Sequence, residues 1–180
     1  MRIRHATRQD GGAIRRLYQC AFAEAERDSV ATLATQLLTG LPTEKISPPS
    51  ISLLAVVEGE LAGHAAFSAV FLKADQHWQG YIVAPLAVQP RQQGKGIGAA
   101  LVEHGIQLLQ EGNNQALFVY GDPAYYSRFG FTARAAAPYL PPYPLRYPFG
   151  WQALMLRGAE PAGQALPITC VPALNLPELW

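Results

Sequence analysis

The sequence has 180 residues, a formal net charge of +1 at pH 7 and 49% hydrophobic residues. This length and composition indicate one globular domain that can bury a core of its own. The balanced charge provides no field for nucleic acid or an anionic membrane surface, so we expect neither as a partner.

The first part of the chain is predicted to form one strand and two helices. The strand is expected at residues 3–7, and Asp10 is the predicted N-cap of the helix that follows. A second helix is expected at residues 29–38, after a polar connection that contains Glu24 and Glu26. The apolar positions at helical spacing are Ile14, Leu17, Tyr18, Ala21 and Phe22 in the first helix, and Val30, Leu33, Leu37 and Leu38 in the second.

A loop and a β-hairpin are predicted next. Residues 41–50 contain three prolines and indicate a loop. The hairpin has strands at residues 52–57 and 61–70, joined by Glu58-Gly59-Glu60. His64 lies in its second strand, where it is either a hydrogen-bonded structural residue or a base.

Residues 81–112 combine an apolar strand, a glycine-rich turn and an amphipathic helix. The strand is expected at residues 81–88, and the helix is expected to end at Gly112-Asn113. The start of a helix attracts anions because its backbone N–H groups are unpaired, and glycine lets a phosphate approach them. The turn has glycine at positions 94, 96 and 98, with Arg91 and Lys95 adding positive charge. It is read as a phosphate site or as a tight turn without a ligand.

Pro85 interrupts the predicted central strand. Because proline has no N–H group to donate, it indicates a bulge or a point where two strands separate. Separation would leave the backbone of Leu86, Ala87 and Val88 free to pair with an extended, amide-containing ligand. A pyrophosphate at the helix start and an amide-bearing arm along the strand together describe coenzyme A.

The remaining chain is predicted to contain short elements. A strand at residues 115–120 completes a β-α-β unit, so it should lie beside the central strand. Gly121-Asp122-Pro123 is expected to break this strand, and Pro123 suits the first turn of a short helix that carries Tyr125 and Tyr126. Residues 133–150, rich in proline and aromatic residues, are either a packed irregular loop or a wall of an acceptor pocket. A last strand is expected at residues 151–157, with a possible short strand at residues 168–171.

Two motifs resemble the GNAT superfamily of acyl-CoA N-acyltransferases. The stretch Arg91-x-x-Gly94-x-Gly96 resembles the superfamily signature (Arg/Gln)-x-x-Gly-x-(Gly/Ala), and Tyr126-x-x-x-Gly130-Phe131 resembles its Tyr-x-x-x-Gly-Phe element. The longer form that begins Gly121-Asp122-Pro123, together with Gly63-His64-x-x-Phe67-Ser68, is similar to the bacterial YhbS-like subgroup of predicted acetyltransferases. The resemblance covers residues 3–156.

The resemblance implies an α/β fold with a mixed, mostly antiparallel sheet that is splayed at strand 81–88 and flanked by helices. Residues 1–157 would form the acetyltransferase domain, and residues 158–180 would be a C-terminal extension packed on it. The implied acyl donor is acetyl-CoA, without a metal. The acetyl group would pass directly to an amine of a small molecule or a peptide.

The resemblance also implies roles for individual residues. Tyr126 would give a proton to the departing thiolate, and the Leu86 N–H group would hold the oxyanion because Pro85 has none. No glutamate occupies the central strand, where some relatives carry a base, so Glu24, Glu26, His64, Asp122 and a water chain stay open. The expected cofactor-binding residues are Leu86, Ala87, Val88, Arg91, Gln93, Gly94, Lys95, Gly96, Ile97, Gly98 and Tyr126.

Two other functional classes were compared with this one. Gly94-x-Gly96-x-x-Ala99 also fits the dinucleotide-binding fingerprint, but residues 112–121 contain no acidic residue for the ribose. A Walker loop is excluded because Gly96, and not Ser or Thr, follows Lys95. A non-catalytic acyl-CoA-binding sensor stays an alternative.

The cysteines and the amino-terminal residues complete the prediction. Cys20 and Cys170 lie in no metal-ligand spacing, so both are expected to be structural. The amino end has no apolar run of signal-peptide length, and a cytoplasmic protein is expected. The sequence is compatible with a monomer or a homodimer.

Overall fold

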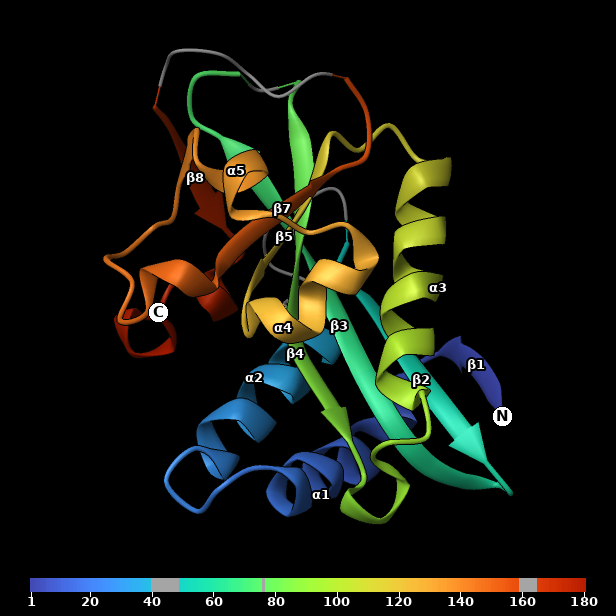
Figure 1. Cartoon of the computed structure of the whole chain (residues 1–180). Helices are drawn as coiled ribbons and strands as arrows, with labels where there is room; N and C mark the ends of the chain where they lie inside the picture. The colour runs from blue at the N-terminus through green and yellow to red at the C-terminus, as the bar shows by residue number, and fades with distance from the viewer. Residues whose placement is uncertain (40–48, 76, 159–164) are drawn as a thin grey trace. The chain divides into compact units, whose positions relative to one another are not determined.

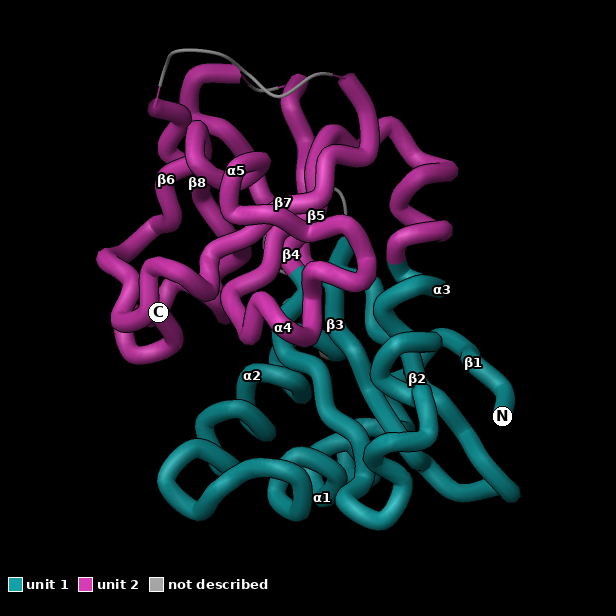
Figure 2. Tube along the Cα trace, viewed as in Figure 1, with its two compact units in different colours: residues 1–67, 83–105 teal, residues 68–82, 106–180 magenta. Residues whose placement is uncertain are grey.

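The computed structural model describes residues 1–39, 49–75, 77–158 and 165–180 (Figure 1). The chain divides into two compact units (Figure 2). Unit 1 comprises residues 1–67 and 83–105, and unit 2 comprises residues 68–82 and 106–180. The predicted loop at residues 41–50 falls outside the described residues, except for its last two positions.

The helices and strands follow the predicted order. The strands are β1 (Arg2–His5), β2 (Ile51–Val57), β3 (Glu60–Leu72), β4 (Gln79–Val88), β5 (Ala116–Tyr120), β6 (Tyr139–Leu140), β7 (Trp151–Met155) and β8 (Leu166–Cys170). The α-helices are α1 (Gly11–Ala21), α2 (Arg27–Thr39), α3 (Ile97–Glu111), α4 (Pro123–Tyr126) and α5 (Ala133–Ala136). The 3-10 helices are η1 (Arg8–Asp10), η2 (Pro90–Gln92), η3 (Ser127–Phe129), η4 (Pro148–Gly150), η5 (Pro172–Leu174) and η6 (Pro177–Leu179).

The strands form a mixed sheet in the order β1-β2-β3-β4-β5-β7, and β8 pairs with β3 and β6. The pairs β1–β2, β2–β3, β5–β7 and β3–β8 are antiparallel, whereas β4–β5 and β6–β8 are parallel. This mostly antiparallel sheet with helices confirms the predicted fold class. The splay of the sheet at β4 stays a prediction.

In unit 1, β2 and β3 form the predicted hairpin. Their register runs from Ile51 opposite Phe67 to Val57 opposite Glu60. The next strand, β4, ends beside β3, where the Gln89 N–H group donates to the Ala62 carbonyl at 2.9 Å. Helices α1 and α2 pack against each other and bury a core with these strands. This core cluster contains Ile14, Leu17, Tyr18, Ala31, Ala34, Leu54 and Ala87.

Asp10 is the N-cap residue of α1, as predicted, but its side chain makes no capping hydrogen bond to this helix. Its carboxylate instead accepts two hydrogen bonds from Arg4, at 2.7 and 2.8 Å, and one from the Thr7 N–H group at 2.7 Å. These bonds close the 3-10 turn before the helix. Hydrogen bonding to Arg4 also holds the pKa of Asp10 well below its usual range.

Helix α3 lies directly against one face of β3. Successive side chains of a strand point to opposite faces, so Gly63 and Phe67 share this face. A Cβ atom at Gly63 would lie 3.0 Å from Leu101 Cδ1, and a Cβ atom at Gly105 of α3 would overlap the Phe67 ring. The helix can pack this closely because glycine stands at both contacts.

The opposite face of β3 carries His64, which is fully buried. Its Nδ1 atom lies 2.8 Å from the Tyr18 hydroxyl of α1, and its Nε2 atom lies 2.7 Å from the Ser52 hydroxyl of β2. A neutral imidazole has one donor and one acceptor nitrogen, and the two hydroxyl groups can pair with both. Burial lowers the pKa of His64 to about 3, so the ring is uncharged at neutral pH.

In unit 2, β4 and β5 are parallel from Gly80 opposite Ala116 to Ile82 opposite Phe118, which confirms the predicted pairing. The core of this unit contains a cluster of aromatic rings. The Phe118 ring stacks on Trp151 with centroids 5.1 Å apart and meets Tyr139 edge to face at 5.0 Å.

The carboxyl-terminal residues of unit 2 join its sheet and core. The possible strand at residues 168–171 is β8, which begins slightly earlier and pairs with β3. Trp180 is buried and lies face to face with Tyr120, their centroids 6.3 Å apart. Its indole N–H group donates to the Leu174 carbonyl at 2.9 Å.

The reading of residues 133–150 as an irregular loop is wrong in part, because α5, β6 and η4 lie there. Thr132 caps α5 by accepting a hydrogen bond from the Ala135 N–H group at 3.1 Å. Tyr139 of β6 is buried, and its carbonyl accepts the Trp151 indole N–H group at 3.0 Å. Tyr147 and Phe149 are exposed. The acceptor wall stays a prediction.

Across the four described ranges, no helix is both long and apolar enough to cross a membrane.

The contact between β3 and α3 predicts a costly substitution. Gly105→Ala places a methyl group on the Phe67 ring, so we expect the free energy of unfolding to fall by about 1–3 kcal/mol through overpacking. Urea denaturation measures the change. In the matched control Gly12→Ala, the new methyl group contacts only Arg16 Nη1 at 3.7 Å, and stability should stay equal or rise. Equal stability of Gly105→Ala and wild type would contradict this packing.

The buried imidazole predicts a pH dependence of stability. Between about pH 6.5 and pH 3, the unfolded chain binds a proton at His64 that the folded chain does not. The free energy of unfolding should therefore decrease as the pH is lowered through this window. Protonation of His64 should account for about 1 kcal/mol of the decrease at pH 5.5. We expect His64→Gln to lack this component, and the exposed control His5→Gln to keep it. Parallel pH profiles for all three proteins would contradict a buried neutral imidazole.

Candidate functional site

The predicted glycine-rich turn lies in unit 1 between β4 and α3, with η2 at its start. Gly94 and Gly96 have φ angles of +75° and +79°, in the left-handed region that side chains disfavour. A Cβ atom at either position would meet nothing within 4 Å. Backbone conformation therefore requires glycine here, and the space over both glycines is open.

The turn offers a row of backbone donors. Two backbone hydrogen bonds bound this row: the Gln93 N–H group donates to the Pro90 carbonyl at 3.4 Å, and the Ala100 N–H group donates to the Gly96 carbonyl at 2.9 Å. The N–H groups of the residues between Gln93 and Ala100 belong to the glycine turn and to the first turn of α3. The dipole of α3 adds positive potential there. This is the chemistry of an anion site.

Two side chains of the turn make hydrogen bonds within it or to the neighbouring strand. The Gln93 amide donates to the Val88 carbonyl at 3.2 Å, which ties the turn to the end of β4. Lys95 Nζ donates to Gln92 Oε1 at 2.9 Å. Arg91, Gln93 and Lys95 are exposed. The turn therefore carries two exposed positive charges, those of Arg91 and Lys95.

Residues at the end of β4 alternate between buried and half-buried positions. Leu86 and Val88 are half-buried, whereas Pro85 and Ala87 are buried. The peptide bond between Ala84 and Pro85 is cis. Unit 1 thus brings together ten of the eleven predicted cofactor-binding positions, in residues 86–98, and Tyr126 belongs to unit 2.

Tyr126 is the last residue of α4. Asp122 caps this helix by accepting a hydrogen bond from the Ala124 N–H group at 2.9 Å, and Pro123 is its first residue. The ring of Tyr126 lies against the backbone of Gly121, where a Cβ atom would come within 2.6 Å of Tyr126 Cε2. The Tyr126 ring can therefore pack on the backbone of residue 121 only because this residue is glycine.

Other aromatic rings surround Tyr126. It meets Tyr125 edge to face with centroids 4.9 Å apart, and Phe131 at 5.7 Å. Gly130 turns the chain between them with a φ angle of +89°. Burial raises the pKa of the Tyr126 phenol well above its ordinary value, and Tyr125 raises it further. The hydroxyl group is protonated at neutral pH, as a phenol with an ordinary pKa near 10 also is, and the raised pKa makes it a weaker acid.

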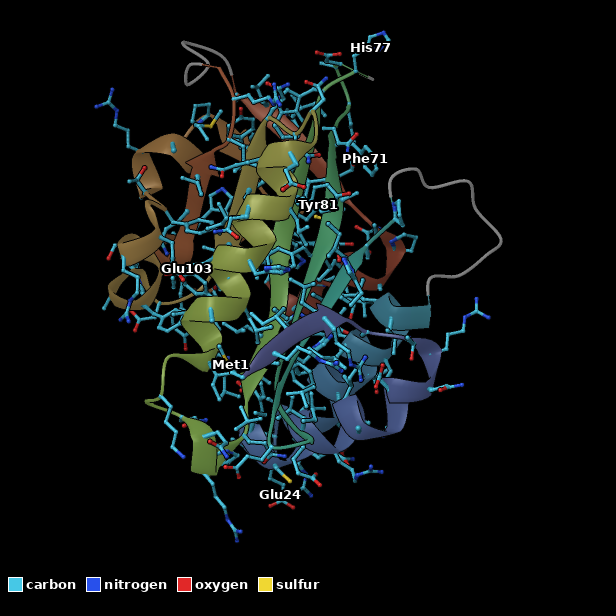
Figure 3. The ribbon with its side chains drawn as sticks, turned by 90° about the vertical axis from the view of Figure 1, so that its right-hand side faces the viewer. Met1, Glu24, Phe71, His77, Tyr81 and Glu103 are labelled. Carbon is cyan, nitrogen blue, oxygen red and sulfur yellow. The ribbon has the colours of Figure 1, made fainter. Side chains whose placement is uncertain are left out.

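The candidate bases differ in their surroundings. His64 is enclosed between Tyr18 and Ser52 with a lowered pKa, which favours the structural interpretation. Glu24 is exposed, points away from unit 1 in Figure 3, and lies 3.4 Å from Arg27. Glu26 and Asp122 are also exposed.

Sequence reasoning missed several supporting residues. It assigned no role to Gly121 beside the Tyr126 ring, or to Tyr18 and Ser52 beside His64. The only signal for Gly121 was its place in the extended motif. Within the described ranges, no group of three or more His, Cys, Asp or Glu side chains is arranged to hold a metal ion.

Comparison with known proteins places this geometry in a family. A family model described as the acetyltransferase (GNAT) family matches residues 12–131, which is more than half of the chain. The chain is also 35% identical over 153 residues to the uncharacterized N-acetyltransferase YjhQ of Escherichia coli strain K12. That match covers 81% of this chain and 80% of YjhQ.

Two solved structures are similar along nearly the whole chain. The GNAT family N-acetyltransferase YhbS from Escherichia coli, in complex with CoA, has a TM-score of 0.79 and 29% identity, and the match covers 97% of this chain and 92% of that chain. A GNAT family acetyltransferase from Brucella melitensis, in complex with acetyl-CoA, has a TM-score of 0.71 and 26% identity, with coverage of 96% and 97%. Together with the family model, these matches confirm the resemblance to YhbS that the sequence motifs indicated, and the chain belongs to the GNAT acetyltransferase family.

Proposed function

We propose that this protein transfers an acetyl group from acetyl-CoA directly to an amine. The observation that carries the proposal is the open turn at residues 94–98, with its row of backbone donors at the start of α3. Family membership supports the reaction class, and complexes of similar proteins with CoA and acetyl-CoA support the donor.

In this proposal the cofactor lies along the end of β4 and across the glycine turn. The N–H groups of residues 94–98 hold the pyrophosphate, and Arg91 and Lys95 add positive charge at the rim. The backbone of residues 86–88 pairs with the amide-bearing arm of the cofactor in the manner of an added strand. Gln93 keeps the turn and the strand end together through its bond to Val88.

The reaction needs an uncharged amine, because an alkyl ammonium with a pKa near 10.4 is nucleophilic in only about one molecule in a thousand at neutral pH. The amine nitrogen attacks the thioester carbonyl carbon, and the Leu86 N–H group stabilises the oxyanion. The C–S bond then breaks, and the Tyr126 hydroxyl donates a proton to the departing thiolate. Alignment of the two reactants supplies much of the rate.

The proton of the amine leaves to an exposed carboxylate, either Glu24, Glu26 or Asp122, or to water. The surroundings of His64 argue against it as the base, because both of its ring nitrogens are engaged and burial opposes its charged form. Residues 158–180 are proposed to be part of the same domain, which the pairing of β8 with β3 supports.

Cofactor binding tests the glycine turn. Acetyl-CoA at a hundredfold excess over Kd should stabilise the wild-type protein by about 2.7 kcal/mol in a thermal-shift titration. Gly94→Val and Gly96→Val should abolish this shift, because valine opposes the left-handed backbone and covers the donors.

Gly59→Val is the matched control. Gly59 has a φ angle of +84° and the same open surroundings, but it lies in the β2–β3 turn, so the variant should keep its response to acetyl-CoA. A shift with NAD in place of acetyl-CoA would refute the proposed donor.

Replacement of Tyr126 tests the proton donor. Tyr126→Phe should lower kcat for thiol release by about 10²-fold or more, while Kd for acetyl-CoA changes little. Tyr125→Phe is the control and should keep kcat. A screen of amines that follows thiol release provides the measurement. Wild-type turnover in Tyr126→Phe would remove the assigned role, and cofactor binding without thiol release for any amine would indicate a sensor.

A further inference from the structure

Gly63 of β3 contacts both parts of the proposed cofactor site. A Cβ atom at this position would lie 2.9 Å from Ile97 Cγ2 and 3.2 Å from the carbonyl oxygen of Ala87. Ile97 is the first residue of α3 and lies within the glycine turn at residues 94–98, and Ala87 is the second-last residue of β4. The lack of a side chain at Gly63 therefore lets these two parts of the site approach the same point of β3.

The surroundings of Gly63 have little room to adjust. Carbon atoms in contact prefer separations of about 3.5–4.0 Å. An added Cβ atom at Gly63 would lie only 2.9 Å from Ile97 and 3.0 Å from Leu101, which is too close. Both side chains are buried, with 4% and 0% of their surface exposed, in an interior that is packed without spare volume. The third neighbour, at Ala87, is backbone and cannot rotate away.

A second contact keeps α3 from simply tilting. Phe67 lies four residues beyond Gly63 on the same face of β3, about 13 Å along the strand. It meets Gly105, which lies eight residues beyond Ile97, about 12 Å along the helix. The two glycine contacts thus match in spacing, and α3 packs closely on β3 at both of them. A methyl group at Gly63 must then displace the first turn of α3, with the glycine turn attached to it, or move β4.

We propose that Gly63 is a positioning residue that sets the spacing between the glycine turn and the end of β4. That spacing decides whether one cofactor can reach the turn with its pyrophosphate and β4 with its amide arm. The inference rests on the proposed function of these two segments. The neighbouring residue His64 serves the other face of the strand by holding α1 through Tyr18.

The test is Gly63→Ala in the full chain, with two readouts. By NMR, we expect the backbone amide resonances of residues 86–88 and 94–98 to shift. By calorimetric titration, we expect Kd for acetyl-CoA to rise at least about tenfold, with a smaller change in kcat at saturating cofactor. If Gly63→Ala fails to fold, Gly63→Ala combined with Leu101→Val removes the Cδ1 contact and keeps those with Ile97 and Ala87. This double variant should then have a higher Kd for acetyl-CoA than Leu101→Val alone, and an equal Kd would overturn the inference.

Two controls separate positioning from general loss of stability. Gly11→Ala makes the same change in unit 1 with only an ordinary contact, 3.7 Å to Leu38 Cδ2, and should keep Kd and the amide resonances. Ile168→Ala removes buried volume in β8 of unit 2, so it should lower stability without changing Kd.

The outcomes distinguish this inference from the proposed function. Unshifted amides and a wild-type Kd in Gly63→Ala would overturn the inference and leave the function in place. An equal rise of Kd in Ile168→Ala would also overturn it, since stability alone would then explain the loss. Absence of acetyl-CoA binding by the wild-type protein would overturn the proposed function, and with it the role of Gly63 in cofactor binding.

Discussion

The close approach of α3 to β3 is the constraint on which the geometry of unit 1 depends. It is possible only because glycine stands at residue 63 of the strand and at residue 105 of the helix, where Cβ atoms would contact Leu101 and overlap the Phe67 ring. The start of the helix is thereby fixed against the sheet. Since the open glycine turn is attached to this start, the packing of a buried face determines where the row of backbone donors lies.

Glycine serves three physical purposes in this protein. Gly94 and Gly96 are required by left-handed backbone, with open space around them. Gly63 is required by close packing between a strand and a helix. Gly121 is required by a single ring, that of Tyr126, which rests on its backbone. A motif that lists these residues only as glycine therefore hides the differences in why each is needed.

Burial shapes the two notable titrating groups in opposite directions, for one reason. Removal from water disfavours the charged form, so the pKa of His64 falls to about 3 and that of Tyr126 rises above its ordinary value. Both groups are therefore neutral at physiological pH. For His64, neutrality suits a buried bridge between hydroxyl groups. The Tyr126 phenol would be neutral at this pH even with its ordinary pKa near 10, so the upward shift changes its strength as an acid and not its charge.

The sequence by itself determined the order of the elements, the glycine turn and the family. These features depend on local signals: apolar periodicity, proline and glycine at element ends, and motifs within short stretches such as residues 91–96. Local signals also placed Pro123 correctly in the first turn of α4, because this proline and the helix are adjacent in the chain.

Only the tertiary structure decided the partners of individual side chains. The Asp10 side chain bonds to Arg4 and not to the N–H groups of α1. The Tyr139 carbonyl accepts a hydrogen bond from the Trp151 indole, which helps to order a segment that was predicted to be irregular. His64 and Gly63 are neighbours in one motif but lie on opposite faces of β3. His64 bonds to Tyr18 of α1, 46 residues earlier in the chain, and Gly63 packs against Ile97 of α3, about 34 residues later. Such contacts join residues far apart in the chain, and no pattern within a short stretch specifies which distant atoms will meet.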